Sequence, residues 1–413
     1  MRILMCNKFN FLSGGAETYL FDLCRGLSDL GHTVINFSTK DRRNIPSAYI
    51  NYFVKAPDLS ASFKNNPVNN IKSAFNFIYS VASARNIERL INEHRPDIAH
   101  IHNIYHHISS SILHTLRKKN MPVVMTLHDY KLICPNYSLF RSGEICEECK
   151  GYKYYNAIRY KCLQGSYLKS ALTCLEMYFC KLLRIYENNV DIFIAPSIFM
   201  QQKTISFGIN PKKICYLPYA INLDGFEPNF AADGYILYFG DISAKKGVRF
   251  FLDNIKHISK KVKIKVVGDG PLRGRLSDLI REEGLENVEL LGHMPRGKLV
   301  NFIRNCLFVV VPSLWPEVVG LNIYEAFACG KCVIASNRGG IPELIENGVN
   351  GLLFDPSRPG ELKDKVQYLI NNPQIGVKFG RNGFEKISKF NNRESHISKL
   401  LEIYSKQIES HRN

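Results

Sequence analysis

The 413-residue sequence contains no apolar run approaching the roughly 18 residues that cross a membrane. Residues 1–8 have only a short apolar stretch, so the apolar region of a signal peptide is also missing. We therefore expect a cytoplasmic protein. Acidic side chains are in deficit, with 37 Asp and Glu against 54 Lys and Arg, and the net charge of +17 calls for an acidic partner.

The motifs of nucleic-acid binding are absent as well. The sequence shows no helix-turn-helix, RNP or zinc-finger spacing, and both halves of the chain carry the positive charge. We therefore expect no nucleic-acid partner, which leaves phosphorylated substrates or an anionic membrane surface. Residues 167–187 combine apolar and aromatic side chains with Lys169, Lys181 and Arg184. Such a helix either lies on an anionic membrane, as in a peripheral protein at its inner face, or packs in a core with its lysines reaching solvent.

The composition indicates a folded α/β protein. A hydrophobic content of 45% and an aromatic content of 11% are typical of globular chains, and the length favours two domains. Short apolar runs alternate with helix-periodic segments, which predicts two Rossmann-like units with parallel sheets. Strands are expected at residues 2–6, 33–38, 97–102, 122–128 and 191–195, and then at 235–240, 263–268, 288–291, 307–312, 332–335 and 351–354.

The domain boundary is predicted within residues 217–234, which contain Pro and Gly without sustained periodicity. We expect an N-terminal domain of residues 1–218 with an insert at 134–162, and a C-terminal domain of residues 219–394. The pattern is helical from residue 381 to residue 408, and the last helix, 395–413, is expected to pack back on the first domain.

Two carboxylates separated by seven residues are the most informative feature of the second half. Glu317 follows Pro316 and precedes Gly320, which predicts a turn, whereas Glu325 lies in a helical run ending at Gly330. The N–H groups at such a helix start are unpaired and, with the helix dipole, form an anion site. A phosphate between two hydroxyl-binding acids suggests a nucleotide-sugar. The alternative is that both acids cap and solvate a surface helix.

Three glycine-rich turns are expected at the carboxyl ends of strands, where doubly wound sheets bind ligands. A glycine lets the backbone approach an anion closely, although each turn alone is also explained as a tight turn. The turns are Ser13-Gly14-Gly15, Gly268-Asp269-Gly270 and Arg338-Gly339-Gly340.

In this succession the chain resembles the GT-B glycosyltransferases, specifically the retaining glycosyltransferase family four. The second half of that family has Pro-Ser, a Glu-seven-residues-Glu spacing, Ala-x-Ala-x-Gly and Gly-Gly-x-Pro-Glu. The resemblance extends over essentially the whole chain and is strongest in residues 235–356. The matching residues, in the same order, are Pro312-Ser313, Glu317 to Glu325, Ala326-Phe327-Ala328-Cys329-Gly330 and Gly339-Gly340-Ile341-Pro342-Glu343.

The resemblance implies a GT-B fold, with two Rossmann-like domains facing a central cleft, and a retaining transfer of a sugar from a UDP- or GDP-sugar to an acceptor hydroxyl. A glycan or lipid-linked acceptor is expected, in the synthesis of cell-surface polysaccharide, lipopolysaccharide or glycolipid. By position, Glu325 would bind the ribose hydroxyls and Glu317 the transferred sugar. The other implied donor contacts are Gly14, Gly15, Gly268 and the backbone amides of Gly320, Leu321 and Asn322.

The resemblance also implies roles for His128 and Lys246. His128, followed by Asp129, would hydrogen-bond the sugar near the reacting carbon. Lys246 would neutralise the diphosphate, so no catalytic metal is expected. Asp241, however, stands where the family has Arg, and a carboxylate there would repel the diphosphate unless Lys245 compensates. This departure motivates an alternative function, a non-catalytic GT-B protein that binds a nucleotide-sugar or glycan.

Four cysteines, Cys134, Cys146, Cys149 and Cys162, follow the His-Asp pair. Twelve cysteines in a chain without an export signal favour reduced thiols or metal ligands over disulfides. The four therefore either form a closed structural zinc site or remain independent thiols. Four nearby histidines lack a clear carboxylate partner, so we expect them to line a cleft or lie at the surface. They are His100, His102, His106 and His107.

Overall fold

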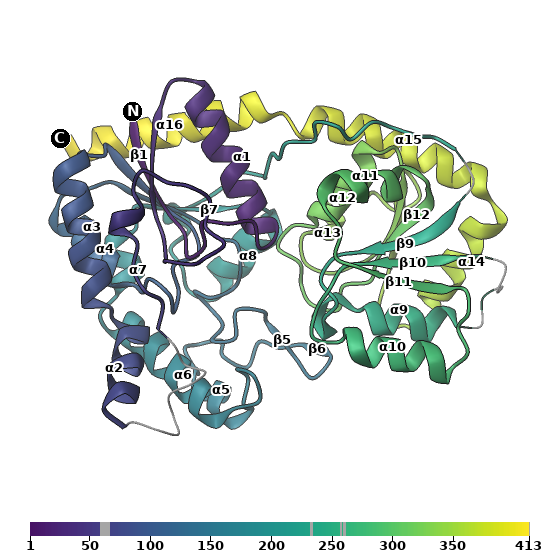
Figure 1. The fold of residues 1–413 in the computed structure, drawn as a ribbon, viewed down its shortest axis with the longest axis horizontal. Helices are drawn as coiled ribbons and strands as arrows, with labels where there is room; N and C mark the ends of the chain where they lie inside the picture. Colours follow the sequence, from purple (N-terminus) through teal and green to yellow (C-terminus); the bar gives the residue numbers. More distant parts are fainter. Residues whose placement is uncertain (58–66, 232–233, 257, 259–261, 413) are drawn as a thin grey trace. The chain divides into compact units, whose positions relative to one another are not determined.

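The computed structural model describes residues 1–57, 67–231, 234–256, 258 and 262–412. The chain divides into two compact units (Figure 1). The first comprises Met1–Leu139, Glu147–Ile221 and Arg393–Asn413, and the second comprises Phe140–Cys146 and Asn222–Asn392. Among the described residues, no helix is both long and apolar enough to cross a membrane.

The first unit contains a six-stranded parallel sheet with the strand order β2-β1-β3-β4-β7-β8. The side chains of β3 and β4 are buried along their whole length, as expected for a parallel sheet covered on both faces. Its elements are β1 (Arg2–Cys6), α1 (Gly15–Asp29), β2 (Thr33–Phe37), η1 (Ile50–Tyr52), α2 (Pro67–Ile78), α3 (Val81–His94), β3 (Ile98–Ile101), α4 (Ser111–Lys118), β4 (Val123–Thr126), α5 (Asn156–Arg159), α6 (Tyr167–Leu182), α7 (Ile185–Asn189), β7 (Ile192–Ala195), α8 (Ile198–Ser206), η2 (Pro211–Lys213), β8 (Ile214–Tyr216) and α16 (Arg393–Arg412).

The second unit contains another six-stranded parallel sheet, with the order β11-β10-β9-β12-β13-β14. Its core joins Ile236, Val266 and Phe308 of the central strands to helix residues such as Phe251 and Val366. Its elements are the hairpin β5 (Phe140–Arg141) and β6 (Glu144–Ile145), then β9 (Tyr235–Phe239), η3 (Ala244–Lys246), α9 (Val248–Ile255), β10 (Ile264–Val267), α10 (Arg273–Glu282), β11 (Val288–Gly292), α11 (Arg296–Arg304), β12 (Cys306–Val311), α12 (Leu321–Ala328), β13 (Cys332–Ser336), α13 (Ile341–Leu344), β14 (Gly351–Phe354), α14 (Glu361–Asn371) and α15 (Pro373–Phe390).

The predicted architecture of two Rossmann-like α/β units is confirmed by these sheets. Because all strands in each sheet are parallel, their carboxyl ends lie at one edge. In the first unit β1 ends before Gly14 and β4 ends before His128, and in the second β12 ends before Glu317. Each unit therefore carries the residues of interest at the edge where such sheets bind ligands.

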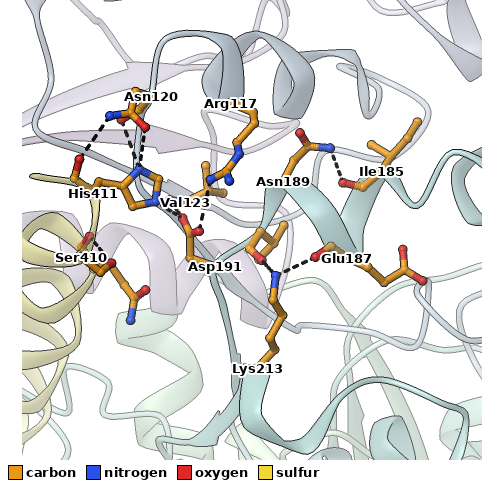
Figure 2. Close-up of polar contacts among 12 residues, drawn as sticks. Arg117, Asn120, Val123, Ile185, Glu187, Asn189, Asp191, Lys213, Ser410 and His411 are labelled. Carbon is orange, nitrogen blue, oxygen red and sulfur yellow. Dashed lines mark hydrogen bonds and ion pairs between the residues drawn. The ribbon is translucent and has the colours of Figure 1, made fainter. Parts of the chain in front are cut away.

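The C-terminal helix α16 belongs to the first unit and is anchored at both ends. Its first turns place His396 against Tyr19 of α1, with 3.0 Å between Nε2 and the hydroxyl oxygen. Near its end, His411 Nε2 lies 3.1 Å from Asp191 Oδ2, and Asn120 Nδ2 donates to the His411 carbonyl at 3.2 Å (Figure 2). A histidine near a helix C-terminus also faces the negative end of the helix dipole.

The structure differs from the sequence prediction in three places. The helical segment predicted over residues 381–408 is two helices, α15 and α16, which end and begin on either side of Asn391 and Asn392. Strand β8 was not predicted because it has only three residues. The hairpin of the predicted insert groups with the second unit, whereas the boundary between Ile221 and Asn222 lies within the predicted residues 217–234. Residues 232–233 of the predicted linker lie outside the described residues.

Candidate functional site

Glu317 lies in the loop between β12 and α12 of the second unit, and its carboxylate is fixed by two side chains. Only 4% of its side chain is exposed. Lys246 Nζ lies 2.7 Å from Oε1, and the Ser313 hydroxyl donates to the same oxygen at 2.5 Å. A buried carboxylate is tolerated when it is paired and hydrogen-bonded in this way. The sequence thus brings together Glu317 and Lys246, which are 71 residues apart.

Glycines allow the backbone to build this loop. The Gly340 N–H donates to the Glu317 carbonyl at 2.8 Å, and Gly339 has φ +62. A Cβ added at Gly339 would lie 2.1 Å from the Glu317 carbonyl oxygen, and one at Gly247 would lie 1.9 Å from the Pro312 carbonyl oxygen. Side chains at these two glycines would therefore displace the loop that carries Glu317.

Two lysines meet at the face of Trp315. Lys245 Nζ lies 4.6 Å and Lys246 Nζ 5.4 Å from the centre of its ring, within the range of a cation–π contact. Asp241 is exposed and lies beside Gly270, where an added Cβ would be 2.8 Å from Asp241 Oδ1. Because Lys246 is ion-paired with Glu317, Lys245 is the cation of this pair left to offset Asp241, and that compensation stays a prediction.

Glu325 lies in the second turn of α12 and, unlike Glu317, is not fixed by another side chain in the part of the chain that the structure describes. Its carboxylate forms no hydrogen bond or ion pair with any residue that the structure describes. Burial raises its pKa to about 7, and the charge of Arg296 on α11 opposes that rise. A desolvated carboxylate without a partner is costly in a folded protein, which makes Glu325 a candidate ligand-binding group.

The start of α12 supplies further donors. Gly320 is the N-cap, and Leu321 and Asn322 are the first helical residues, whose N–H groups have no acceptor within the helix. The amides named from the sequence therefore lie at a helix start, and their contact with a donor stays a prediction. Gly268 follows β10 with φ +141, and a Cβ there would lie 1.9 Å from the Gly240 carbonyl oxygen. Backbone packing explains this glycine without a ligand, and its donor contact stays a prediction.

His128, in the first unit, follows β4 and is held from both sides. Its Nδ1 hydrogen-bonds with the Tyr219 hydroxyl, and its Nε2 lies 2.8 Å from Nδ1 of His102. The His102 and His128 rings stack at 5.1 Å with an angle of 22°. Neither Tyr219 nor His102 was assigned a role from the sequence, because their contacts with His128 span 91 and 26 residues.

The histidines that were expected to line a cleft or lie at the surface are instead buried or paired. His100 and His102 are fully buried, and His100 bonds Tyr404 of α16 at 2.6 Å and Thr126 at 2.7 Å. Burial lowers the pKa of His100 and of His128 to about 3, so both are neutral near pH 7. His106 has the carboxylate partner that the sequence did not reveal, since its Nδ1 lies 3.2 Å from Glu176 Oε2.

The first glycine-rich turn leads into α1. Gly14 is the N-cap and Gly15 the first helical residue, and both are exposed. Glu17 in the first turn of α1 is buried and accepts a hydrogen bond from Asn7 Nδ2 at 3.2 Å, and burial raises the pKa of its carboxyl. The predicted donor contacts of Gly14 and Gly15 stay predictions.

The four candidate zinc ligands do not gather into a site. Among the residues described, no three or more His, Cys, Asp or Glu side chains are arranged to hold a metal ion. Cys149 packs instead with Tyr154, Cys174 and Met177 in a small apolar cluster. Cys134 Sγ donates to Asn136 Oδ1 at 2.9 Å. Zinc binding by Cys134, Cys146, Cys149 and Cys162 stays a prediction, which metal analysis of the purified protein would test.

Comparisons with known proteins agree with this architecture. The model of "Glycosyltransferase Family 4" matches residues 13–224, just over half of the chain, and that of "Glycosyl transferases group 1" matches residues 225–386. A 42.6 kDa protein in the cps region of Klebsiella pneumoniae is 26% identical over 83% of this chain and 87% of its own length. A glycosyltransferase of Methanocaldococcus jannaschii is 38% identical over 37% of this chain, and the match covers 43% of that relative.

The structure of HepE from Anabaena, in complex with UDP, superimposes with a TM-score of 0.69. The two chains are 20% identical, and the match covers 98% of this chain and 100% of HepE. At this identity the likeness shows a shared GT-B fold. Because the first family model covers more than half of its residues, this chain belongs to glycosyltransferase family 4.

Proposed function

We propose that this protein is a retaining glycosyltransferase that moves a sugar from a nucleoside diphosphate sugar to an acceptor hydroxyl. The observation that carries the proposal is the pair of acids on one loop and helix. Glu317 is fixed by Lys246, and Glu325 is desolvated with no hydrogen-bond or ion-pair partner among the residues described. Carboxylates accept hydrogen bonds from hydroxyl groups, and the ribose of a nucleotide offers two such donors. HepE, which shares this fold, has been solved with UDP and with UDP-glucose, which supports a UDP-sugar as donor.

In the proposed reaction, the bond between the sugar C1 and the diphosphate oxygen breaks while a bond from the acceptor oxygen to C1 forms on the same face. The acceptor hydroxyl proton passes to the departing phosphate oxygen, and the nucleoside diphosphate leaves. Lys246, Lys245 and the first amides of α12 would stabilise the charge on the diphosphate. Both ring nitrogens of His128 are held by Tyr219 and His102, so one of these bonds must open before His128 can bind the sugar.

We further propose that the protein works at the inner face of a membrane on a glycan or lipid-linked acceptor. The Klebsiella relative in a cps region supports cell-surface polysaccharide synthesis as the setting. No catalytic metal is part of the proposed reaction. The second candidate function, a non-catalytic protein that binds a nucleotide-sugar or glycan, is motivated by Asp241, an acid where a cation is expected.

A ligand panel followed by a turnover assay tests these functions. We expect UDP or GDP, and the corresponding sugar, to raise the melting temperature, because a ligand of the folded state stabilises it by mass action. Glu325→Ala should abolish this shift. Turnover on an acceptor or water should be lost in Glu325→Ala and in His128→Ala, and NMR of the product should show the retained anomer. A clear shift without turnover on any acceptor would favour the non-catalytic protein, and no shift with any nucleotide would overturn both.

A further inference from the structure

Helix α6 of the first unit exposes an apolar stripe. Leu168, Leu175 and Leu182 are 52%, 58% and 84% exposed, and Tyr178 at 37% lies on the same helix face. The opposite face of α6 is buried through residues such as Met177. Removing apolar surface from water is favourable, so a row of leucines left in water on a helix that already has a buried face marks a contact surface.

The stripe is part of a larger apolar surface. Of the nineteen large apolar side chains exposed in the described part of the chain, eight fall within residues 152–183. Tyr155 lies next to the stripe, because its N–H donates to the Tyr178 hydroxyl at 3.3 Å. The eight are Tyr152, Tyr155, Tyr167, Leu168, Leu175, Tyr178, Leu182 and Leu183.

The charges along this segment are mostly basic, and the first acid that follows it, Glu187, pairs with Lys181 at 2.6 Å. Residues 150–184 contain seven basic side chains and one acid, Glu176, which is buried and bonded to Lys131 at 2.7 Å. Lys161 Nζ lies 4.3 Å from the ring centre of Tyr167, so the cations border the apolar side chains directly. Among the described residues, only Lys181 of the seven pairs with a carboxylate, and Lys169 donates to the amide oxygen of Gln164 at 2.6 Å. The other five are Lys150, Lys153, Arg159, Lys161 and Arg184.

A cavity of about 560 Å³ opens at the C-terminal end of the stripe, and its lining includes Leu182, Arg184 and Lys213. The Lys213 ammonium already has hydrogen-bond partners, since it donates to the carbonyl oxygens of Glu187 and Val190 at 2.6 and 2.8 Å (Figure 2 shows Lys213 reaching toward Glu187). Arg184 is not held in this way, so it is available to a phosphate group.

We propose that the α6 surface, defined as Tyr167, Leu168, Leu175, Tyr178 and Leu182 with the surrounding cations, docks this protein on an anionic phospholipid bilayer. A second copy of the chain would bring like charges together, whereas an anionic bilayer neutralises them. Tyrosines suit the membrane–water interface, and leucines reach the acyl boundary below it. The inference rests on the peripheral placement proposed above and not on glycosyl transfer itself.

Sedimentation with lipid vesicles tests this docking surface. The full-length protein should sediment with phosphatidylcholine vesicles that contain phosphatidylglycerol, less with phosphatidylcholine alone, and less as salt is raised. The double variant Leu175→Glu with Leu182→Glu, and the double variant Arg159→Glu with Lys161→Glu, should each bind the mixed vesicles about tenfold or more weakly.

Matched controls carry the same changes elsewhere. Leu30→Glu with Val81→Glu alters two side chains that are 60% and 41% exposed in the same unit, and it should bind like the wild type. Arg275→Glu with Lys363→Glu makes the same change of net charge on the second unit and should weaken vesicle binding much less than Arg159→Glu with Lys161→Glu.

Equal losses of vesicle binding in variants and controls would overturn the proposal. So would a wild-type dimer that dissociates in the leucine variant. Nucleotide should raise the melting temperature of every variant as it does that of the wild type. If nucleotide does not raise the melting temperature, the transferase proposal fails and the docking proposal is unaffected.

Discussion

The buried carboxyl of Glu325 lowers the stability of the protein but is suited to binding a ligand, as is typical of functional sites. Its folded pKa of about 7 lies above the ordinary value of 4.5, so the folded state takes up a proton that the unfolded state releases. The ionised carboxyl therefore costs stability as pH rises from 4.5 through 7. At pH 8 this cost is about 3 kcal/mol by linkage, and it is below about 1 kcal/mol at pH 5.

Glu325→Gln should remove this cost together with the binding role. We expect the variant to be more stable than the wild type at pH 8 by about 1–3 kcal/mol and nearly equal to it at pH 5, as measured by denaturant unfolding. The same variant should lose its melting shift with nucleotide. Glu282→Gln, an exposed acid on α10, is the control and should change neither property. A variant that loses stability at pH 8 would show that the carboxylate has a native partner.

The acid pair could be predicted from sequence because its spacing, its flanking Pro316 and Gly320, and the family resemblance are all local. The side chains that hydrogen-bond or ion-pair with the site residues could not be predicted, since they come from distant segments. Lys246 reaches Glu317 across 71 residues, and Tyr219 reaches His128 across 91. A chemical pattern identifies which groups will be near a ligand, whereas their protonation depends on burial that only the folded core creates.

Among the elements, strands of four or more residues were predicted within one or two positions, because burial on both faces leaves a mostly apolar run in the sequence. Helix α16 was predicted as a helix that packs on the first domain, and the residues that make this contact were not predicted. It lies against α1 through a close approach at Gly26, where an added Cβ would be 2.3 Å from Ile397 Cδ1. A glycine inside a helix is normally unfavourable, so its presence in α1 is explained by this neighbour.

Gly26→Ala should therefore destabilise the protein, although alanine is the better helix former. We expect a loss of about 1–2 kcal/mol, because the new methyl group must displace the buried Ile397 side chain. Gly274→Ala in α10 is the matched control, since a Cβ there meets nothing within 4 Å and should add about 0.5–1 kcal/mol. Urea unfolding of both variants measures the difference. If Gly26→Ala were as stabilising as Gly274→Ala, α1 and α16 would be packed more loosely than the structure shows.

At the scale of the whole molecule, the two units should respond to acid in opposite directions. In the first unit, burial lowers the pKa of His100 to about 3 and that of His396 to about 4, and lowers that of His102 well below its ordinary value. A lowered histidine pKa means that the unfolded chain takes up protons that the folded unit cannot, so stability is lost as pH falls below 6.5. In the second unit, protonation of Glu325 relieves a cost as pH falls below 7.

Calorimetry at about pH 8 and about pH 5 should show these opposite shifts. His100 and His396 cost the first unit about 2 kcal/mol each at pH 5, and His102 adds to this loss, whereas Glu325 returns about 2 kcal/mol to the second. Burial raises the pKa of Glu17, which offsets only part of the loss in the first unit. The lowered pKa of Glu176 affects stability only below about pH 4.5.

Trp315 is the single tryptophan of the chain and belongs to the second unit, so its fluorescence assigns the transitions. We expect the Trp315 transition to rise in temperature on acidification while the other falls, and Glu325→Gln to abolish the rise. A Trp315 transition that falls with acid in the wild type would contradict the desolvation of Glu325, and with it the reason for assigning that residue to the ligand.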